Sequence, residues 1–530
     1  MEKRTIDRRE TSFFSELSNA LVYNQESLKD FIEMPYSIEA FKGQIAKKNE
    51  NYNHSFRKTL RDQLIKQYSH LDPNDAVVQN ILSLEKQDTF TVTTGHQLNL
   101  YTGPLYFIYK IVHVIKLTED LKKEYPDFNF VPVYWMASED HDFAEINHLN
   151  LFNAKREWTS EQSGAVGKFS LNGFDSLKSE VLSLFENQPE IAHFIEESYL
   201  TDENLAQATL NLVDKLFGEK GLVILDADSP ELKALYRPVL FKEVREQFSV
   251  KAVEKQTQLL EEKGYFGQVH PREINLFFMD NGRRERIIRN QDTSFSVGED
   301  ISFTALELLE LIDAKPELIS PNVVLRPVYQ EWILPNLAYV GGGGEMAYWL
   351  QLKGVFDALG LQYPLIEVRN SVQIVDAPTQ KKMEKMEYNF ENFIGSIDAL
   401  KKDFVMQNSD EDLEFEELEE KFKALEKAIV NDVLKVDKAL ESYGKSELTK
   451  MRKQIDNMQN KLIRHQKKRF EDTLKQIDKV NDKLFPNNGL QERYENVLAY
   501  FSKFGKDNFL EEVYNAIDPK EKDLIILQEN

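Results

Sequence analysis

The chain contains no cysteine among its 530 residues. That absence excludes disulfide bonds, a thiol nucleophile and a metal site built on thiolates. It is compatible with an enzyme that handles a free thiol as its substrate.

Long apolar runs and a surplus of positive charge are also missing. No segment is long and apolar enough to cross a bilayer, and the charged start Met1–Phe14 has no apolar region of the kind that marks a protein for export. We therefore expect a cytoplasmic protein with no membrane partner. The net charge of −23 argues against general nucleic-acid binding, which needs a basic face. Local basic clusters can still hold an anionic substrate.

The length exceeds that of one compact core, so we expect two or more substructures. Strand and helix patterns over residues 1–375 predict an α/β core with N-terminal helices and inserted segments at about 143–217 and 250–315. A helical coiled coil is predicted over 376–485. The C-terminal segment, 486–530, is expected to return to the core.

The stretch Thr91–Lys116 predicts a strand, a loop and a helix. A β-branched run ends at Gly95, polar side chains follow, and an apolar pattern of helical period begins near Pro104. Backbone N–H groups left unpaired at a helix start, with the helix dipole, suit a phosphate or a carboxylate. The alternative is an ordinary turn in which the glycine only provides room. The candidate binding residues here are Gly95, His96, Gln97, Asn99 and Gly103.

A continuous apolar run, Asn129–Ala137, predicts a strand buried on both faces. Acidic and imidazole groups crowd directly after it, at Ser138, Glu139, Asp140, His141, Asp142, Glu145 and His148. Such groups cost solvation energy unless they have partners or a task. Here they can act as general acid or base, hold an ammonium group, or ligate a metal through oxygen and imidazole. Helix capping is the alternative; it accounts for Ser138 and Glu139 but poorly for His141.

A second apolar strand, Gly221–Asp226, also ends in carboxylates, those of Asp226 and Asp228. One such end can be explained by capping. The recurrence favours a site, because ligands of open α/β sheets bind outside the carboxyl ends of the strands.

The stretch Ser320–Glu345 predicts a short strand, Val323–Leu325, and closes with four consecutive glycines before a helix. Glycine permits close approach of the backbone to a ligand, and a Gly-rich loop can cradle phosphate through its N–H groups. A later apolar run, Tyr363–Val368, also ends in polar residues. The candidates from these two stretches are Asn322, Arg326, Gly341, Gly342, Gly343, Gly344, Arg369 and Asn370.

Upstream, Asp280-Asn281-Gly282 predicts a hairpin turn between two strands. The arginines that follow, Arg283, Arg284 and Arg286, are interpreted as a solvated face; the alternative is that one of them reaches an anion.

From Ala377 onward, apolar residues recur at alternating steps of three and four, the pattern of heptads. The first series runs without a break from Met383 to Phe404, and the helix predicted from Ala377 to the break at Gln407 is about 45 Å long. Breaks at Gln407–Ser409 and at Tyr443-Gly444 divide the region into at least three helices. Such long stripes need a partner, and we expect both an antiparallel hairpin and a homodimer through the coiled coil.

Six segments, read together, are similar to one known family: TGHQ followed by YTGPLYFIYK, PVYWMASEDHDFAEINH, GLVILDAD, NLFFMDNGRRE, SPNVVLRP and YVGGGGEMAYWLQLK. The chain resembles the cysteine ligase family of bacillithiol biosynthesis over essentially its whole length. The resemblance implies a Rossmann-like core with inserted connecting segments, a long coiled-coil arm and a dimer. It also implies amide formation between the carboxyl of cysteine and the amine of glucosaminyl-malate.

That implied reaction is uphill in water, so ATP with Mg²⁺ is expected to drive it, and no structural metal is expected. On the resemblance, the two glycine stretches with Gln97, Asn99 and the helix start hold nucleotide phosphate. Asp140, His141, Asp142 and His96 form the catalytic group, which orients the cysteine ammonium or deprotonates the sugar amine. The substrate-binding candidates are Asp226, Asp228, Asn322, Arg326, Arg369 and Asn370.

Two other classes of function stay open. One is a binding or scaffold protein in which the coiled coil is the working part and the core is a degenerate nucleotide fold. The other is a metal-dependent hydrolase that uses His141, Asp142, Glu145 and His148.

Overall fold

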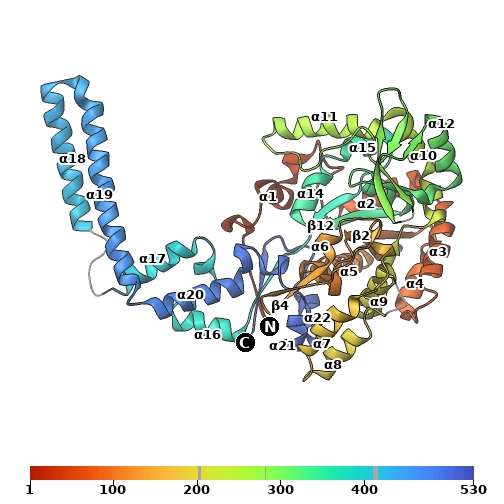
Figure 1. Ribbon diagram of the computed structural model, residues 1–530, viewed down its shortest axis with the longest axis horizontal. Coiled ribbons are helices and arrows are strands. Elements are labelled where there is room, and N and C mark those ends of the chain that lie inside the picture. The colour runs from red at the N-terminus through yellow and green to blue at the C-terminus, as the bar shows by residue number, and fades with distance from the viewer. Residues whose placement is uncertain (201–203, 281, 410–415, 530) are drawn as a thin grey trace. The chain divides into compact units, whose positions relative to one another are not determined.

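The structure is a computed structural model that describes residues 1–200, 204–280, 282–409 and 416–529, and the chain divides into two units (Figure 1). The first unit comprises residues 1–373 and 491–527. The second comprises residues 374–490 and 528–530. The boundary therefore falls within β14 (Val372–Val375) and again within β15 (Leu524–Gln528), which lie in a three-stranded sheet of order β1-β15-β14, with β1 at Glu2–Ile6.

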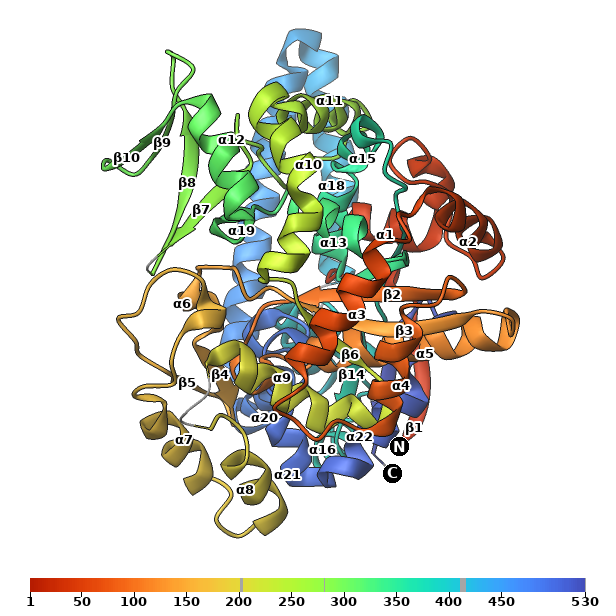
Figure 2. The same cartoon turned by 90° about the vertical axis from the view of Figure 1, so that its right-hand side faces the viewer.

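The first unit is built on a five-stranded parallel sheet of order β13-β12-β2-β3-β6. Its strands are β2 (Thr89–His96), β3 (Asn129–Met136), β6 (Val223–Asp226), β12 (Asn336–Gly341) and β13 (Leu365–Val368). Strands β2 and β3 lie side by side, from Thr89 opposite Asn129 to His96 opposite Met136 (Figure 2). This sheet confirms the predicted α/β, Rossmann-like fold class.

Both faces of this sheet are covered, which is why its strands are apolar or β-branched throughout. Helix α5 (Tyr106–Glu124) and helix α2 (Ala40–Asn51) contribute to one fully packed cluster with the strands. The cluster contains Phe41, Ile45, Phe90, Val92, Val114, Leu117, Leu121, Phe130, Leu337, Ala338, Val340 and Leu365.

The order of the strands places a reversal beside β2. From β2 the chain moves to β3 and β6 on one side, and later returns to β12 and β13 on the other. In open α/β sheets such a reversal leaves a crevice outside the carboxyl ends of the strands, where ligands bind. The residues after Gly95 and after Gly341 lie at that reversal.

The remaining helices of the first unit surround these strands (Figures 1 and 2). They are α1 (Glu16–Tyr23), α3 (Phe56–Gln67), α4 (Asp75–Ser83), α6 (Phe143–Ile146), α7 (Phe174–Ser183), α8 (Pro189–Glu196), α9 (Leu205–Phe217), α10 (Pro230–Glu246), α11 (Phe248–Glu262), α12 (Ala305–Ala314), α13 (Arg326–Ile333), α14 (Gly343–Trp349), α15 (Lys353–Leu359), α21 (Leu498–Phe504) and α22 (Lys506–Ala516).

The inserted segments carry antiparallel strands. One is the pair β4 (His148–Leu151) and β5 (Ala154–Glu157). The other is a five-stranded sheet of order β10-β9-β8-β7-β11. Its strands are β7 (Leu276–Asp280), β8 (Arg283–Arg289), β9 (Phe295–Val297), β10 (Ile301–Phe303) and β11 (Ile319–Pro321).

The predicted hairpin is present, since Asp280 pairs with Arg283 across the turn between β7 and β8; its residue Asn281 lies outside the described residues. The predicted strand at Val323–Leu325 is wrong. Asn322 Oδ1 accepts the backbone N–H of Val324 at 2.9 Å, and the backbone N–H of Arg326 donates to Asn322 O at 2.8 Å. This turn ends β11 and starts α13, because a short polar side chain competes with strand pairing for the backbone donors.

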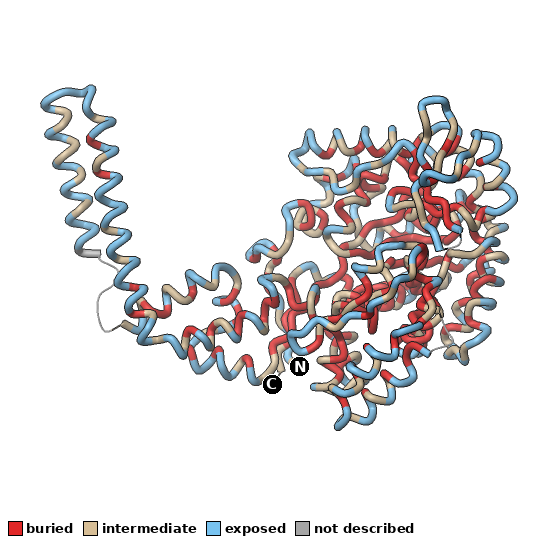
Figure 3. Tube along the Cα trace, viewed as in Figure 1, coloured by how far each residue is buried: buried red, intermediate tan, exposed pale blue. Residues whose placement is uncertain are grey.

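The second unit is helical, with α16 (Ala377–Lys385), α17 (Ile397–Gln407), α18 (Glu416–Val436), α19 (Glu441–Lys467) and α20 (Glu471–Leu484). Helices α18 and α19 form an antiparallel hairpin, in which Arg452 pairs with Glu426 at 3.0 Å. With 27 residues, α19 spans about 40 Å. Much of this hairpin is exposed, in contrast with the interior of the first unit (Figure 3).

Two details of the heptad prediction are wrong. The series from Met383 to Phe404 is not one helix, because Glu387 and Gly395 have positive φ values of 59° and 130°, which end α16 and precede the Ser396 cap of α17. Gly444 does not break a helix either; it lies inside α19, where a Cβ would stand 3.4 Å from Val433 of α18. The glycine lets the two helices approach, and the turn falls at Asp437–Leu440 instead.

Candidate active site

A cavity of about 750 Å³ lies in the first unit, outside the carboxyl ends of β2, β3, β6 and β12. It is lined by many of the residues predicted from the sequence: Gly95, His96, Gln97, Asp140, His141, Asp228, Asn322, Arg326, Gly342, Gly343, Gly344 and Arg369. The reversal of strand order therefore brings together stretches that are up to 270 residues apart in the chain.

The lining of this cavity is more positive than the chain as a whole. Among the described residues that line it, there are seven lysines and arginines and four carboxylates. The positive residues are Lys110, Arg272, Arg284, Arg286, Arg326, Arg369 and Arg493; the acidic ones are Glu139, Asp140, Asp228 and Glu345. On a chain of net charge −23, this local surplus favours an anionic ligand.

The end of β2 is held by a chain of hydrogen bonds that crosses to β12 and α14. The backbone N–H of Gly95 donates to the Tyr339 hydroxyl at 3.0 Å, and that hydroxyl donates to Glu345 at 2.6 Å. Lys110, from the second turn of α5, donates to Glu345 at 2.6 Å and to the carbonyl of Gly95 at 2.9 Å. Gly95 must be glycine here, since a Cβ would stand 2.6 Å from the Tyr339 hydroxyl.

Lys110 and Glu345 form a buried ion pair that faces the cavity. Burial lowers the pKa of Lys110 although Glu345 opposes this effect, and the guanidinium groups of Arg369 and Arg326 lower it further. Glu345 is buried too, but the charge and hydrogen bond of Lys110 hold the pKa of its carboxyl below the ordinary value. Glu345 therefore carries its negative charge at neutral pH.

The loop after β3 presents Asp140 and His141 to the cavity. Gln97 donates to Asp140 at 2.9 Å and to Glu145 at 2.7 Å, which ties the ends of β2 and β3 together. Burial raises the pKa of Asp140, but the hydrogen bonds from the Gln97 amide and the His141 backbone N–H, with the nearby guanidinium of Arg284, outweigh burial and leave that pKa lowered. Asp140 is thus an anion near neutral pH and a weak base.

The short segment Val166–Lys168 clamps this loop from outside. Val166 donates its backbone N–H to the carbonyl of Asp140 at 2.7 Å, and Gly167 donates to the carbonyl of Ser138 at 2.8 Å. A Cβ on Gly167 would stand 2.6 Å from the Ser138 Cβ. The loop is therefore positioned by the inserted segment and not by the Rossmann-like sheet alone.

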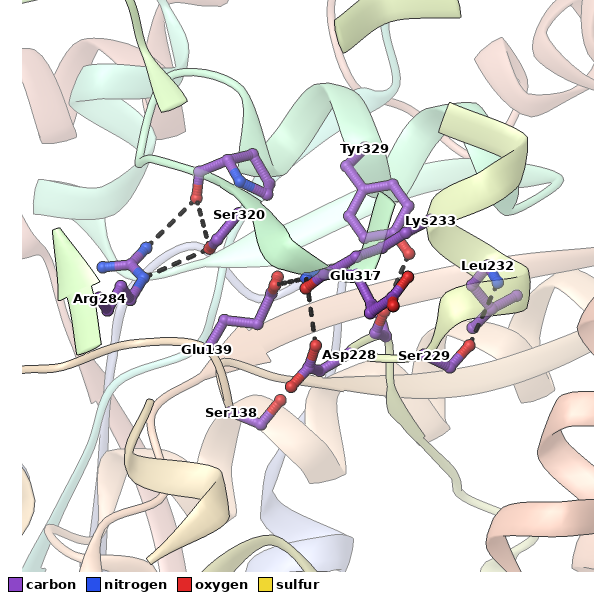
Figure 4. A network of polar contacts seen from close by, with 12 residues as sticks. Ser138, Glu139, Asp228, Ser229, Leu232, Lys233, Arg284, Glu317, Ser320 and Tyr329 are labelled. Carbon is purple, nitrogen blue, oxygen red and sulfur yellow. Dashed lines mark hydrogen bonds and ion pairs between the residues drawn. The ribbon is translucent and has the colours of Figure 1, made fainter. Parts of the chain in front are cut away.

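Beneath the same loop, Lys233 of α10 joins two carboxylates (Figure 4). It forms ion pairs with Glu139 and, at 3.1 Å, with Asp228, and it donates to the carbonyl of Glu317 at 3.1 Å. Its side chain is 1% exposed. Burial lowers the pKa of Lys233, but the two carboxylates more than offset burial, and the resulting pKa is raised.

Asp226 and Asp228 do not present open carboxylates to the cavity. Asp226 accepts hydrogen bonds from the Ser138 hydroxyl at 2.5 Å and from the backbone N–H of Asp228 at 3.0 Å. Burial and the neighbouring Asp228 raise its pKa. Asp228 is paired with Lys233 at 3.1 Å and with Lys168 at 3.0 Å. Their predicted role in substrate binding therefore competes with contacts already made.

Arg369 and Asn370 are also committed within the fold. Both terminal nitrogens of Arg369 bind Glu492, at 2.7 and 3.0 Å, in a buried pair. Asn370 is fully buried and does not line the cavity; its side chain donates to the carbonyl of Glu521 at 2.8 Å and accepts from the backbone of Asp518 at 3.1 Å. These contacts anchor the C-terminal segment. The predicted contact of Asn370 with substrate is therefore wrong, whereas Arg369 still lines the cavity.

Four further candidates lie outside the cavity lining. Asn99 donates to the carbonyl of Glu145 and packs on Gly103, whose φ of 64° explains the glycine. Asp142 is exposed at the start of α6. Gly341 is buried, and a Cβ on it would stand 2.5 Å from Met346. For these four residues the sequence pattern identified the correct loop, but it did not identify which residues of the loop face the cavity.

His96 lines the cavity as a neutral imidazole. Burial, with the charges of Lys110 and Arg369, lowers its pKa well below the ordinary value. Its Nε2 atom is buried and has no hydrogen-bond partner among the described residues. The ring packs against Tyr106 and Phe107 at 5.3 and 5.0 Å between centroids.

Sequence reasoning missed Lys110, Tyr339 and Glu345. It favoured a solvated face for Arg284 and left open that one arginine of this group reaches an anion. A signal for Lys110 was available, since it is a lone charge between Tyr109 and Ile111 in an otherwise apolar turn. Arg284 gave no such signal. Its side chain is 7% exposed, and it faces the cavity because β8 folds back over the loop after β3.

No donor set for a metal is assembled in residues 1–200, 204–280, 282–409 and 416–529: no three His, Asp or Glu side chains lie close enough to hold an ion. His148, which the hydrolase alternative requires, contacts Asn147 instead. We therefore derive no step through a protein-bound metal. Within the same described residues, no helix is both long and apolar enough to cross a bilayer.

Comparison with known proteins gives matches along the whole chain. Residues 1–370 match the N-terminal Rossmann-like domain of bacillithiol biosynthesis BshC, and residues 372–529 match its C-terminal coiled-coil domain. A relative named cysteine ligase BshC from Flavobacterium psychrophilum is 42% identical over 95% of both chains. Relatives of the same name from Flavobacterium johnsoniae and Christiangramia forsetii are 39% identical over 94% of this chain and 95% of that one, and 37% identical over 99% of both.

Proposed function

The chain belongs to the bacillithiol biosynthesis BshC family, and on that premise we propose that it joins the carboxyl of cysteine to the amine of glucosaminyl-malate in an ATP-driven ligation. The observation that carries this proposal is the positive cavity at the reversal of strand order. Malate contributes two carboxylates and ATP contributes phosphates. A pocket with more guanidinium and ammonium groups than carboxylates suits both.

The cavity has room for a phosphate group beside its glycines. A Cβ on Gly342 or Gly344 would have no atom within 4 Å, whereas one on Gly343 would meet Ser18. Lys110 and Arg326 line the same side. These groups fit a nucleotide and would hold its phosphates. Bound ATP supplies the activation of the cysteine carboxyl, which gives up one oxygen to the phosphate that leaves.

The residues on the opposite side would orient the amines. Asp140 is held as an anion by Gln97 and by the backbone N–H of His141, at 2.9 and 2.8 Å. An anion fixed in this way attracts an ammonium group without taking its proton. Glu139 and Asp228 share Lys233, and Asp228 also pairs with Lys168. Asp140 has a more distant cation, the guanidinium of Arg284 at 3.8 Å, so Asp140 is the carboxylate of this side with most charge to offer.

The test is a mass-spectrometric assay of the full chain with ATP, Mg²⁺, cysteine and glucosaminyl-malate, following thiol product and nucleotide together. We expect the ligated thiol, with AMP or ADP in equal amount. The matched variants are Asp140→Asn, which removes the charge that faces the cavity, and Asp300→Asn, whose carboxylate pairs on the surface with Arg283. Loss of product with the first and not the second supports the assignment. No product from the folded native chain overturns the proposal and favours a binding or scaffold role.

We also propose a homodimer through the coiled coil. The hairpin of α18 and α19 exposes large apolar side chains, and Leu418 and Leu425, like Met451 and Met458, are seven residues apart, as in a heptad seam. The exposed set is Leu418, Leu425, Val436, Leu440, Tyr443, Met451, Met458 and Leu462.

Light scattering after gel filtration tests this dimer. We expect the native chain at twice the 61.8 kDa of one copy and the double variant Leu425→Lys, Met451→Lys at one copy. Lys450→Glu, on the exposed polar side of α19, is the control and should stay dimeric. A monomeric native chain would contradict the proposal.

A further inference from the structure

Arg284 is held rigidly at the wall of the cavity. Its Nε donates to the Ser320 hydroxyl and its Nη2 to the carbonyl of Pro321, both at 3.3 Å. The guanidinium lies over the ring of Phe277 at 4.0 Å from the centroid. Only 7% of the side chain is exposed. Figure 4 shows Arg284 with its contacts to Ser320 and the following carbonyl. Two nitrogens and one face of the guanidinium thus contact β7 and β11, which leaves the third nitrogen, Nη1, for the loop after β3.

That third nitrogen, Nη1, lies 2.6 Å from Nδ1 of His141. A guanidinium has donors and no acceptor, so Nδ1 must accept with its lone pair. A neutral imidazole whose Nδ1 accepts carries its proton on Nε2. Asp140 also faces the ring: its Oδ1 lies 3.5 Å from Nδ1 and 3.8 Å from Nη1 of Arg284, and it already accepts the His141 backbone N–H. The apolar ring of Phe277 packs against the imidazole as well.

We propose that Arg284 is a positioning residue that holds His141 in the Nε2–H tautomer, so that His141 serves the ligation as a hydrogen-bond donor and not as a general base. This inference rests on the proposed function and replaces the expectation that His141 deprotonates the sugar amine. The Nε2–H group can donate to a ligand oxygen that gains negative charge. The carbonyl oxygen of the activated carboxyl is such an oxygen when the amine attacks. In this role His141 keeps its proton throughout.

Through this contact the inserted antiparallel sheet contributes to the site. Arg284 lies on β8 of the inserted sheet and reaches the loop after β3 through its contacts with His141 and Asp140. The donor orientation of His141 is therefore set by the insertion, whereas the Rossmann-like sheet sets only where the loop begins. A preorganised donor aimed at developing charge is the kind of group whose removal costs about 10²–10³-fold in kcat.

The first test needs no turnover. The chain is labelled with ¹⁵N in its histidine rings, sedimented, and measured by solid-state ¹⁵N NMR, with the His141→Gln spectrum subtracted to isolate His141. We expect an unprotonated Nδ1 and a protonated Nε2 in the native chain, and protonation at Nδ1 toward Asp140 in Arg284→Met. A native signal with the proton on Nδ1, or no change in Arg284→Met, overturns the proposal. Arg283→Met, on the same strand and paired with Asp300 on the surface, should match the native spectrum.

The second test uses the conservative variants of His141. Glutamine places an amide N–H near the position of Nε2, and asparagine places its amide near Nδ1. We expect His141→Gln to keep at least tenfold more kcat than His141→Asn, and Arg284→Met to lower kcat with little change in KM. Equal inactivity of both His141 variants, with full activity of Arg284→Met, would restore the general-base role. If the native chain forms no product, the proposed function fails, and the NMR test of Arg284 still stands.

Discussion

Two buried lysines beside the same cavity differ in how they are neutralised. Lys233 binds the two carboxylates of Glu139 and Asp228, and its pKa is raised. Lys110 binds one carboxylate, Glu345, among the guanidinium groups of Arg326 and Arg369, and its pKa is lowered. The two lysine side chains are similarly buried, at 1% and 6% exposed, so the number and sign of the neighbouring charges produce the difference.

The comparison separates a structural cluster from a functional one. The Lys233 cluster has its charges satisfied internally and leaves little for a ligand. The Lys110 cluster lies where Gly342 and Gly344 leave open space, and it faces a surplus of positive charge that only an incoming anion balances. Changes in the Lys233 cluster should therefore affect stability first, and changes in the Lys110 cluster should affect ligand binding and turnover first.

The largest effect is expected from Lys233→Met. It leaves two buried carboxylates without their shared partner, and breaking a buried ion pair from one side costs about 3–5 kcal/mol in the free energy of unfolding. Urea denaturation followed by tryptophan fluorescence measures the loss. Lys168→Met removes the other lysine that pairs with Asp228. Because the Lys168 side chain is 63% exposed, this variant should lose less than about 1 kcal/mol in the free energy of unfolding. Equal losses for the two variants would remove the distinction between them.

Lys110→Met tests the functional side. We expect kcat to fall by about 10²-fold, the usual cost of losing one charged donor in a preorganised site, because the phosphate side of the cavity loses its ammonium group. The loss of stability should be smaller than for Lys233→Met, since Glu345 is 19% exposed and keeps the Tyr339 hydroxyl. Lys123→Met, exposed on the same helix, is the control. Full activity of Lys110→Met would contradict the functional role of the Lys110 cluster.

The glycines sharpen the comparison further. Gly95→Ala forces a Cβ to 2.6 Å from the Tyr339 hydroxyl, and overpacking of this kind costs about 1–3 kcal/mol. Gly344→Ala meets no atom within 4 Å and should leave the melting temperature unchanged while raising the KM for ATP. A melting temperature that falls equally in both variants would mean that Gly344 serves the fold and not a ligand.

The smallest effect concerns a buried carboxylate that lacks any lysine. Oδ1 of Asp214 on α9 is buried without a hydrogen-bond partner among the described residues, and burial raises the pKa of this carboxyl from its ordinary value of 3.8 to about 6. The folded state holds the proton more tightly than the unfolded state, so ionisation costs stability progressively from pH 4 to pH 6 and fully above that.

Asp214→Asn should therefore raise the melting temperature at pH 7 and lose this advantage near pH 4. Thermal unfolding of both chains across that range measures the difference. Glu219→Gln, a neighbouring exposed carboxylate, should show no such pH dependence. A gain that is constant with pH would contradict the assignment to ionisation.

The sequence by itself determined the class of fold and the rim of the site. Apolar strands that end in polar residues predicted where β2, β3 and β6 stop, and the heptads predicted a helical arm, because periodicity and burial are local properties of the chain. Asp140, His141 and the glycine stretches were identified on that basis, and they do line the cavity.

Only the tertiary structure decided what each of these groups contacts. Whether Asp228 is open or already neutralised depends on Lys233 from α10, and which nitrogen of His141 carries its proton depends on Arg284 from β8. Neither partner is near in sequence, and neither follows from a local pattern. Electrostatic roles are set by distance and burial in space, so they emerge only when the inserted segments fold back over the strand ends.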